Sequence, residues 1–371
     1  MEGPALAPVG PGLEESSGAG GEGVEPFVAG QAPRAFAHFR RGINLGNRLE
    51  SKPNEGAWGG RIEDGDLRLI AERGFDHVRI PVWFSGHASE VAPFALDAAF
   101  LSRVDQVLDL AALQGLAVVL TLHGYYELEA NVAGHTLRLL GLWSQLSEHY
   151  RERPETLAFE LFNEPPQSMQ STWNGLAAEL IAAVRQTNPR RLLVIDATSW
   201  ADTTTLGSLQ LPNDANLAVA VHPYEPKLFS FQGKTWGDPS WQTSGVVFPG
   251  PPASPLMAHP AAQANPAASQ WFMQYNTLPA AQNPSGPRTV HEQIARVQAY
   301  RQASGRAVMN TEWGPQNGGD ITSRANLMRV MRQECEAAAI PWTIWEDPNN
   351  LPLYDSSTGQ WQEALVSTLF E

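Results

Sequence analysis

The stretch that decides the fold is residues 157–166, which read Leu157-Ala158-Phe159-Glu160-Leu161-Phe162-Asn163-Glu164-Pro165-Pro166. Its first six residues are apolar except for Glu160, a pattern typical of a strand buried on both faces. Pro165 has no N–H for a ladder and restricts Glu164 to an extended conformation, so the strand ends there. Glu164 is therefore predicted to point out of the end of the sheet, beside Asn163. Taken alone, this pattern fits a solvated glutamate at a strand end equally well.

A second glutamate stands in a similar setting. Another short apolar run ends in a glutamate within the sequence Ala307-Val308-Met309-Asn310-Thr311-Glu312-Trp313-Gly314. The two glutamates are 312 − 164 = 148 residues apart, so only the fold can bring them together.

Composition narrows the class of protein. The chain has 371 residues, of which 43% are hydrophobic, enough for a large core in one or two domains. The formal net charge, 25 − 39 = −14, disfavours nucleic acid and anionic membranes and favours a neutral substrate. The twelve Trp are many for this length, and a Trp outside the core offers a flat surface for the apolar face of a sugar. With Cys335 as its single cysteine, the chain can form neither an intramolecular disulfide nor an all-cysteine metal site.

The N-terminal segment differs from the rest of the chain. Residues 1–33 contain no Lys or Arg and are rich in Gly, Pro and Glu, which is the composition neither of a signal peptide nor of a packed segment. We therefore expect residues 1–36 to be a disordered tail or a linker remnant. Residues 37–371 are expected to form a single domain, and no apolar run has the length of a transmembrane helix.

Strands and helices are predicted to alternate along this domain. Buried strands are expected at residues 41–47, 75–81, 117–122, 157–162, 192–195, 216–221, 307–312 and 341–345. Helices are expected at residues 62–73, 98–114, 136–150, 173–188, 291–304, 325–339 and 362–370, with a weakly marked helix near Leu206. Eight such units with right-handed crossovers predict a (β/α)8 TIM barrel, with an open doubly wound sheet as the competitor.

The distribution of polar residues favours the barrel. Unusual polar or aromatic residues stand at the C-terminal ends of the predicted strands: Asn47, Arg79, His123, Asn163, Glu164, His222, Tyr224, Glu312 and Trp345. A barrel gathers all these ends around one mouth, where such folds keep their sites. An open sheet would concentrate them near one switch point instead.

One long insertion follows the sixth strand. Residues 233–287 are rich in Pro, Ala, Gln and Ser and contain several aromatic residues, which argue against full disorder. Because the segment leaves the same strand end as His222, we expect it to lie over the mouth of the barrel. It is interpreted as a wall of a substrate cleft, with a purely structural flap as the alternative.

Two carboxylates at one face of a barrel can break a glycosidic bond. One must be protonated to help the leaving oxygen depart, and the other must be ionised to stabilise or trap the oxocarbenium-like centre. Their repulsion would separate the roles, because a charged Glu312 raises the pKa of a nearby Glu164. Neither role follows from charge alone.

Neighbouring residues have both catalytic and structural interpretations. Asn163 is a candidate for bonding a sugar hydroxyl, and Arg79 and Tyr224 for holding a carboxylate ionised. Arg79 is equally suited to a buried structural ion pair. His123 and His222 are equally interpreted as strand-end histidines bonded to backbone.

These motifs, in this order, resemble glycoside hydrolase family 5, in particular its cellulase-type endoglucanases. The resemblance runs from about Arg41 to the C-terminus and rests on Gly42-Ile43-Asn44-Leu45-Gly46-Asn47, Val78-Arg79-Ile80-Pro81-Val82, Leu122-His123, Phe159-Glu160-Leu161-Phe162-Asn163-Glu164-Pro165, His222-Pro223-Tyr224, Thr311-Glu312-Trp313-Gly314 and Trp342-Thr343-Ile344-Trp345-Glu346.

The resemblance implies a retaining endo-β-1,4-glycanase that needs no metal or other cofactor, with Glu164 as acid/base and Glu312 as nucleophile. It also implies the residues that line the subsite of the cleaved sugar, with Trp345 as the platform beneath it: Asn47, Arg79, His123, Asn163, His222, Tyr224 and Trp345. We further expect a monomer, exported from the cell, that acts on β-linked polysaccharide or oligosaccharide.

Four departures from the family pattern leave the polysaccharide open. Gly124 stands where the family often has a second His, Trp313 replaces a usual Phe, and Arg48 is bulkier than expected. The insertion at 233–287 is also longer than the common loop. Glucan, mannan, xyloglucan and mixed-linkage glucan therefore remain candidate substrates. Two other classes are kept as alternatives: a carbohydrate-binding barrel without turnover, and a metal-dependent hydrolase that uses His123, His222 and a glutamate.

Overall fold

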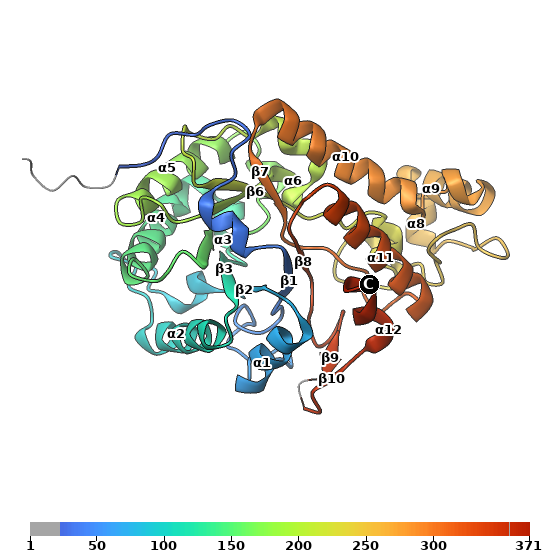
Figure 1. The fold of residues 1–371 in the computed structure, drawn as a ribbon. Helices are drawn as coiled ribbons and strands as arrows, with labels where there is room; N and C mark the ends of the chain where they lie inside the picture. Colours follow the sequence, from blue (N-terminus) through green and yellow to red (C-terminus); the bar gives the residue numbers. More distant parts are fainter. Residues whose placement is uncertain (1–22, 356) are drawn as a thin grey trace, which may run out of the picture.

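The computed structural model describes residues 23–355 and 357–371, and at its centre is a closed barrel of eight parallel strands (Figure 1). The strands follow one another around the ring in chain order, and β1 pairs with β8 to close it. They are β1 (Arg41–Asn44), β2 (His77–Val82), β3 (Ala117–Leu122), β4 (Leu157–Glu160), β5 (Leu193–Asp196), β6 (Leu217–Val221), β7 (Ala307–Asn310) and β8 (Trp342–Ile344). The predicted (β/α)8 barrel is confirmed.

Helices surround the barrel on its outside. The α-helices are α1 (Asp64–Arg73), α2 (Ala98–Leu113), α3 (Tyr126–Ala130), α4 (Val132–His149), α5 (Trp173–Arg185), α6 (Thr198–Ala201), α7 (Lys227–Ser230), α8 (Pro260–Ala264), α9 (Pro266–Thr277), α10 (Pro287–Ser304), α11 (Ile321–Ala337) and α12 (Glu363–Val366). Short 3-10 helices are η1 (Arg34–His38), η2 (Phe84–His87), η3 (Gln167–Met169), η4 (Thr203–Ser208), η5 (Pro239–Gln242), η6 (Ala280–Gln282) and η7 (Ser367–Leu369), and β9 (Tyr354–Asp355) pairs with β10 (Gln360–Trp361). No helix within the described ranges has both the length and the apolar character that crossing a membrane requires.

The predicted elements are present, and several of the strands are shorter than expected. The strands expected at 41–47, 157–162 and 307–312 end at Asn44, Glu160 and Asn310. Asn163, Glu164 and Glu312 therefore stand on the loops that follow the strands. The weakly predicted helix near Leu206 is the 3-10 helix η4, and the expected closing helix is split into α12 and η7.

The inside of the barrel has an apolar floor and a polar upper layer. Side chains on one strand alternate between the two faces, so residues two apart share the inner face. On β4 the inner pair is Ala158 and Glu160, and on β5 it is Val194 and Asp196, all buried. The apolar member of each pair packs with Ala35 and Phe39 beneath the barrel, whereas the polar member lies nearer the mouth.

Neighbouring strands of the barrel are paired over unequal lengths. β2 and β3 align over six residues, from the pair His77–Ala117 to the pair Val82–Leu122. In contrast, β7 and β8 are paired only at Asn310 and Trp342. The seam between β7 and β8 is continued at the mouth by one further hydrogen bond, donated by the N–H of Trp345 to the carbonyl of Trp313 at 2.7 Å.

The segment before β1 differs from the expected tail. Residues 1–22 lie outside the described residues, but the chain contacts the barrel from Glu25 onward. The carbonyl of Glu25 accepts the N–H of Ala215 at 2.9 Å, and the ring of Phe27 lies 3.7 Å from the guanidinium of Arg306. The side chain of Ala35 in η1 is buried. The described part of residues 1–36 thus packs on the barrel, because its few apolar side chains find partners there.

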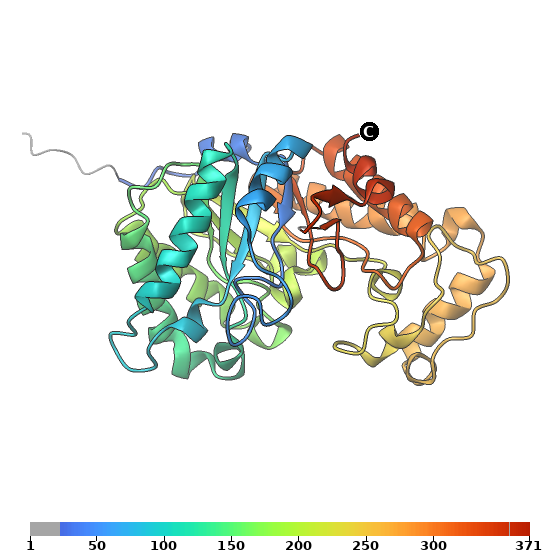
Figure 2. The same cartoon turned by 90° about the horizontal axis from the view of Figure 1, so that it is seen from below.

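The insertion at 233–287 folds as a lobe that projects from one side of the barrel (Figure 2). It contains η5, α8, α9 and η6, and it has its own buried side chains, among them Phe272 and Tyr275. Phe248 joins the lobe to the barrel, because its ring lies 5.7 Å from that of Phe229 and its carbonyl accepts the amide of Asn326. Figure 2 shows the lobe on one side of the barrel, and Lys234 at its start bonds Asn317 and Asn350 of the loops after β7 and β8. Its role as a wall of the substrate cleft stays a prediction.

Candidate active site

The two predicted catalytic glutamates come together at the mouth. Single carboxylate oxygens of Glu164 and Glu312 and a ring nitrogen of His222 all lie within 4.8 Å of one another. Nδ1 of His222 is 2.8 Å from Glu164 Oε1 and 3.8 Å from Glu312 Oε2. The loops after β4 and β7, which are far apart in sequence, thus place two carboxylates at one point above the barrel.

Glu312 is the more enclosed and the better supported of the two. It is 5% exposed. Its Oε1 accepts a hydrogen bond from Arg79 at 2.6 Å, and its Oε2 accepts one from the Tyr224 hydroxyl at 3.1 Å. Burial raises the pKa of Glu312, while His222 and Arg79 act to lower it and Glu164 adds to the rise. The two donors favour the ionised form of this carboxylate.

Glu164 has the opposite environment. Burial raises its pKa to about 7, although 27% of its side chain remains exposed at the mouth. The sequence argument attributed this rise to the charge on Glu312, but burial is its main cause, and the carboxylate that adds to the rise is Glu160. Within residues 23–355 and 357–371, the ion pair seen for the Glu164 carboxylate is its contact with His222. A proton shared by the two glutamates is therefore held more readily on Glu164.

The backbone of Glu164 contradicts one prediction. An extended conformation was expected before Pro165, yet the φ of Glu164 is +53°. Positive φ is uncommon for a residue with a side chain and is usually maintained by surrounding contacts. One such contact is visible, because the N–H of Glu164 donates to Asp196 Oδ2 at 2.9 Å.

Arg79 is both a site residue and a structural ion-pair partner, so its two interpretations hold together. Besides Glu312, it bonds both oxygens of Glu160, at 2.6 and 3.0 Å, and Oδ1 of Asn163 at 2.7 Å. Its side chain is fully buried, and burial acts to lower its pKa. Glu160 and Glu312 overcome that effect and raise the pKa of Arg79. In return, Arg79 lowers the pKa of Glu160 to about 2 against the effect of burial.

The two histidines have different surroundings. His222 is buried, and it contacts side chains where the structural interpretation expected backbone: Glu164 and, at 3.0 Å, the Thr311 hydroxyl. Burial lowers the pKa of His222 to about 4, so it is neutral near pH 7. His123 is half-buried, with Nε2 3.4 Å from Nδ2 of Asn163, and burial followed by the charge of Arg79 lowers its pKa strongly.

Trp345 and Asn47 form the opposite side of the mouth. Both donate to Asp347: the indole Nε1 of Trp345 to Oδ2 at 2.8 Å, and Nδ2 of Asn47 to Oδ1 at 2.9 Å. The ring of Trp345 lies 6.3 Å from that of His123, which connects this side to Asn163. Asn47 is therefore connected to the site through Asp347, which also holds Trp345.

Sequence reasoning missed three buried carboxylates: Glu160, Asp196 and Asp347, each 0% exposed. Two of them had a visible signal. Glu160 interrupts an apolar strand, and Asp196 follows the apolar run 192–195 directly. Asp347 lies just beyond the motif that ends at Glu346 and had no comparable signal.

The departures from the family pattern fill space near the site. Lys52 donates to the carbonyl of Gly124 at 3.1 Å, and its ammonium lies 4.6 Å from the ring of Trp83, close to where a second His would stand. Trp313 is buried and its ring lies 5.7 Å from that of Trp342. Arg48 is a buried ion-pair partner of Glu346 at 2.8 Å.

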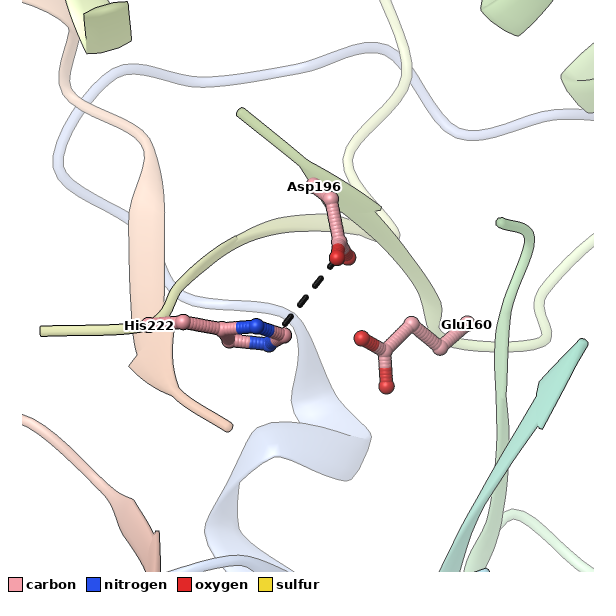
Figure 3. Close-up of side chains that lie close together, drawn as sticks. All are labelled: Glu160, Asp196 and His222. Atoms are coloured by element: carbon pink, nitrogen blue, oxygen red, sulfur yellow. Dashed lines mark ion pairs between the residues drawn. The ribbon is translucent and has the colours of Figure 1, made fainter. Parts of the chain in front are cut away.

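Two groups of side chains in the described ranges have donor atoms close enough to reach one ion. One is Glu164, His222 and Glu312, and the other is Glu160, Asp196 and His222 (Figure 3). Neither contains His123, which the metal-dependent alternative required. The guanidinium of Arg79 bonds Glu160 and Glu312, one carboxylate from each group, and so already supplies a positive charge there. This donor set does not favour a metal ion.

Comparison with known proteins agrees with this geometry. A family model described as Cellulase (glycosyl hydrolase family 5) matches residues 43–350. Endoglucanase H of Acetivibrio thermocellus is 31% identical over 198 residues, which are 53% of this chain and 22% of the relative. Endoglucanase 3 of Fibrobacter succinogenes is 24% identical over 344 residues, which are 87% of this chain and 51% of the relative.

The same relationship is seen among solved structures. Cel5A of Thermotoga maritima, solved with cellobiose and with mannotriose, superposes with a TM-score of 0.78 in both cases at 29% identity, covering 90% of this chain and 98% of that one. The chain thus spans about half or less of the first two sequence relatives but nearly all of this structural one. Because the family match covers most of the barrel and both mouth glutamates, the chain belongs to the cellulase family, glycosyl hydrolase family 5.

Proposed function

We propose that this protein is a retaining, endo-acting glycoside hydrolase that cleaves β-1,4-linked polysaccharide, with β-glucan as the main substrate. The observation that carries the proposal is the approach of Glu164 and Glu312 to within 4.8 Å, measured between single carboxylate oxygens. Retaining pairs stand roughly 5–5.5 Å apart, whereas inverting pairs need about 6.5–9.5 Å to admit a water. The endo mode rests on the relatives named endoglucanase.

In the first half-reaction, Glu312 is the nucleophile and Glu164 the acid. A carboxylate oxygen of Glu312 bonds to the anomeric carbon while the bond to the leaving sugar breaks. The electron pair of that bond goes to the glycosidic oxygen, which takes the proton of Glu164. Arg79 and Tyr224 keep Glu312 ionised before attack, because both donate hydrogen bonds to it.

In the second half-reaction, Glu164 acts as a base. It removes a proton from water as the water oxygen attacks the anomeric carbon, and the ester bond breaks to return its electron pair to Glu312. While the ester exists Glu312 carries no charge, so a negative Glu164 no longer faces a second carboxylate. The raised pKa of Glu164 suits both roles, since it lies close to neutral pH.

The remaining mouth residues position the sugar. Arg79 bonds only the oxygen of the Asn163 amide, so the amide nitrogen can donate to a hydroxyl of the sugar that is attacked. Trp345, whose edge is fixed by Asp347, is the proposed platform for the face of that sugar. His123 lies between them, and the 3.4 Å contact of its Nε2 with Nδ2 of Asn163 helps to orient that amide toward the same sugar.

The proposal also concerns which sugar forms the main chain of the substrate polysaccharide. A mannan-cleaving enzyme of the same mechanism is the second candidate, because the related Thermotoga maritima structure was also solved with mannotriose. Xyloglucan and mixed-linkage glucan remain within the same mechanism. We also propose that the protein acts outside the cell, since such polymers are taken up only after cleavage. We further propose that it acts as a monomer.

The proposal is tested with barley β-glucan, carboxymethyl cellulose, galactomannan and xyloglucan. Product chromatography should show internal cleavage, and proton NMR of the first products should show the β-anomer before mutarotation. An α-anomer would refute retention. Binding of these polymers without release of reducing ends would instead support the carbohydrate-binding barrel.

A further inference from the structure

We propose that Asp196 is a positioning residue for the acid/base: as a neutral carboxylic acid it accepts the N–H of Glu164 on Oδ2 and donates its own proton from Oδ1 to Glu160. This inference rests on the proposed role of Glu164. It assigns to Asp196 a part in the reaction that none of the motifs of the sequence indicated.

The first step of the argument is the strained backbone of Glu164. Its φ is +53° although a proline follows, a combination that a chain does not adopt without support. The hydrogen bond from the Glu164 N–H to Asp196 Oδ2, 2.9 Å long, supports this conformation directly. Asp196 lies at the end of β5, next to β4, and has no exposed surface. It therefore acts on Glu164 through the backbone and has no path to the substrate.

The second step is the position of the other oxygen. Oδ1 of Asp196 is buried and meets no N–H or O–H donor among the described residues. Nε2 of His222 lies 3.9 Å from Oδ2 and is engaged by the Thr311 hydroxyl at 3.0 Å. Figure 3 shows the carboxyl groups of Asp196 and Glu160 approaching each other inside the barrel. One oxygen of Asp196 and one of Glu160 lie within 4.8 Å of each other, so in this buried site ionisation of one carboxyl group favours protonation of the other.

The third step is the balance of charge around Asp196. The charged or titratable groups that face it are Arg79 from β2, Glu160 from β4, Glu164 from the loop after β4, and His222 just after β6. Arg79 is one positive charge, already bonded by Glu160 and Glu312. A third carboxylate charge would be uncompensated in a buried site, and this is costly.

The titration behaviour agrees with this assignment. Burial and the charge of Glu160 raise the pKa of Asp196 well above its usual value. Burial acts to raise the pKa of Glu160, but the charge of Arg79 overcomes it, and the neighbouring Asp196 adds to the lowering. The proton of the pair therefore belongs to Asp196, and Glu160 remains the charged partner of Arg79.

The test compares Asp196→Asn with Asp196→Ala. An asparagine places an acceptor toward the Glu164 N–H and a donor toward Glu160, so D196N should keep the wild-type rate and the wild-type pH limits of activity. D196A removes both contacts and should lower kcat on polysaccharide by about 10–100-fold. The pre-steady-state burst of aryl release from an activated aryl cellobioside should fall far less, because its leaving group needs no proton from Glu164.

Stability provides a readout that is independent of activity. Above about pH 4 an unfolded chain releases the Asp196 proton, whereas the folded chain retains it. The contribution of this proton to stability is therefore full below that pH and is lost as the pH rises. D196N has no such proton, so its Tm relative to wild type should increase between about pH 4 and 8. An ionised, ion-paired Asp196 would instead give a Tm difference that is constant above about pH 4 and changes only below it.

Asp214→Asn is the matched control. Asp214 is another buried aspartate, but it is bonded to Arg185 at 2.6 Å and lies ahead of β6, at the floor of the barrel. D214N should lower the Tm without changing the ratio of polysaccharide to aryl activity.

Three outcomes would overturn the inference: D196N as impaired as D196A, D196N with shifted pH limits, or D196A with an unchanged activity ratio. Glu164→Gln is measured in parallel. If E164Q still hydrolyses polysaccharide, the proposed function itself fails, whereas an inactive E164Q beside a fully active D196A refutes only the role of Asp196.

Discussion

Single residues divide the chemistry at the mouth, and substitution can separate the two glutamates. Glu164→Ala should lose polysaccharide hydrolysis by about 10²–10⁴-fold, the range expected for a general acid. It should keep the burst of aryl release from an activated aryl cellobioside. Glu312→Ala should lose activity on both substrates, because no covalent intermediate forms. Stopped-flow kinetics measures this difference, with Glu127→Ala on the exposed face of α3 as control. Equal losses in the two variants would contradict the assignment.

The contacts of these residues also predict a bell-shaped pH profile. The proposed mechanism requires Glu312 ionised and Glu164 protonated, so activity should fall as the pH rises through about 7, the pKa of Glu164. On the acid side, Tyr224→Phe removes the O–H that stabilises the Glu312 carboxylate. The pKa of Glu312 then increases, and the acid limit should move to higher pH. A profile of kcat/KM against pH measures both limits. The control is Tyr150→Phe, at a buried tyrosine that follows the last residue of α4 and whose hydroxyl has no hydrogen-bond partner in the described ranges. This substitution should leave both pH limits unchanged.

Residue types and order alone predicted much of this site, because charged and amide groups at strand ends are unusual enough to be noticed. Arg79 and Tyr224 both donate hydrogen bonds to Glu312, as the sequence suggested. The sequence did not reveal which buried residue supports the backbone of Glu164. Glu164 departs from its expected conformation through a bond to Asp196, and pairwise contacts of this kind depend on which strands become neighbours.

At the scale of elements, the loop after β6 carries aromatic rings outward from the site. The ring of Tyr224 lies 4.9 Å from that of Phe231, which lies 5.6 Å from Trp236. Trp236 is 59% exposed, and Trp241 supports it at 5.3 Å. An exposed indole held by two other rings is suited to stacking on a sugar some distance from the bond that breaks.

Trp236→Ala should therefore affect long substrates more than short ones. We expect KM for cellohexaose to increase by about 10-fold, from the loss of one stacking contact, with kcat on an aryl cellobioside unchanged. Initial rates on oligosaccharides of increasing length measure this dependence. Met257→Ala, an exposed residue of the same lobe, is the control. A uniform loss on all lengths would show that Trp236 supports only the fold of the loop.

Helix and strand order was predictable because each element has a simple period and a clear end. Gly74 and Gly305, at φ of 103° and 70°, end α1 and α10 where the pattern indicated. The position of the insertion was not predictable, because it depends on side chains such as Phe248 that find partners only in the folded molecule. Its lobe lies beside the barrel as a consequence.

At the scale of the whole molecule, the site draws its positive charge from the protein itself. Arg79 bonds Glu160 and Glu312, so we expect hydrolysis of barley β-glucan to be unchanged after dialysis against a chelator. Rates before and after dialysis, and after addition of Zn²⁺ or Ca²⁺, measure this. Loss of activity that a divalent ion restores would instead identify a metal-dependent enzyme.

The single pairing between β7 and β8 has a consequence for how the enzyme accommodates its polymer. Glu312 follows one of these strands and Trp345 follows the other, so the nucleophile and the proposed sugar platform face each other across the least continuous joint of the ring. A small shift of Trp345 there would change the distance between them, while Glu312 stays bonded to Arg79, which is anchored on the long β2–β3 ladder. Such a shift would let the sugar platform adjust to an incoming polysaccharide chain while the Glu312 carboxylate keeps its place beside Arg79.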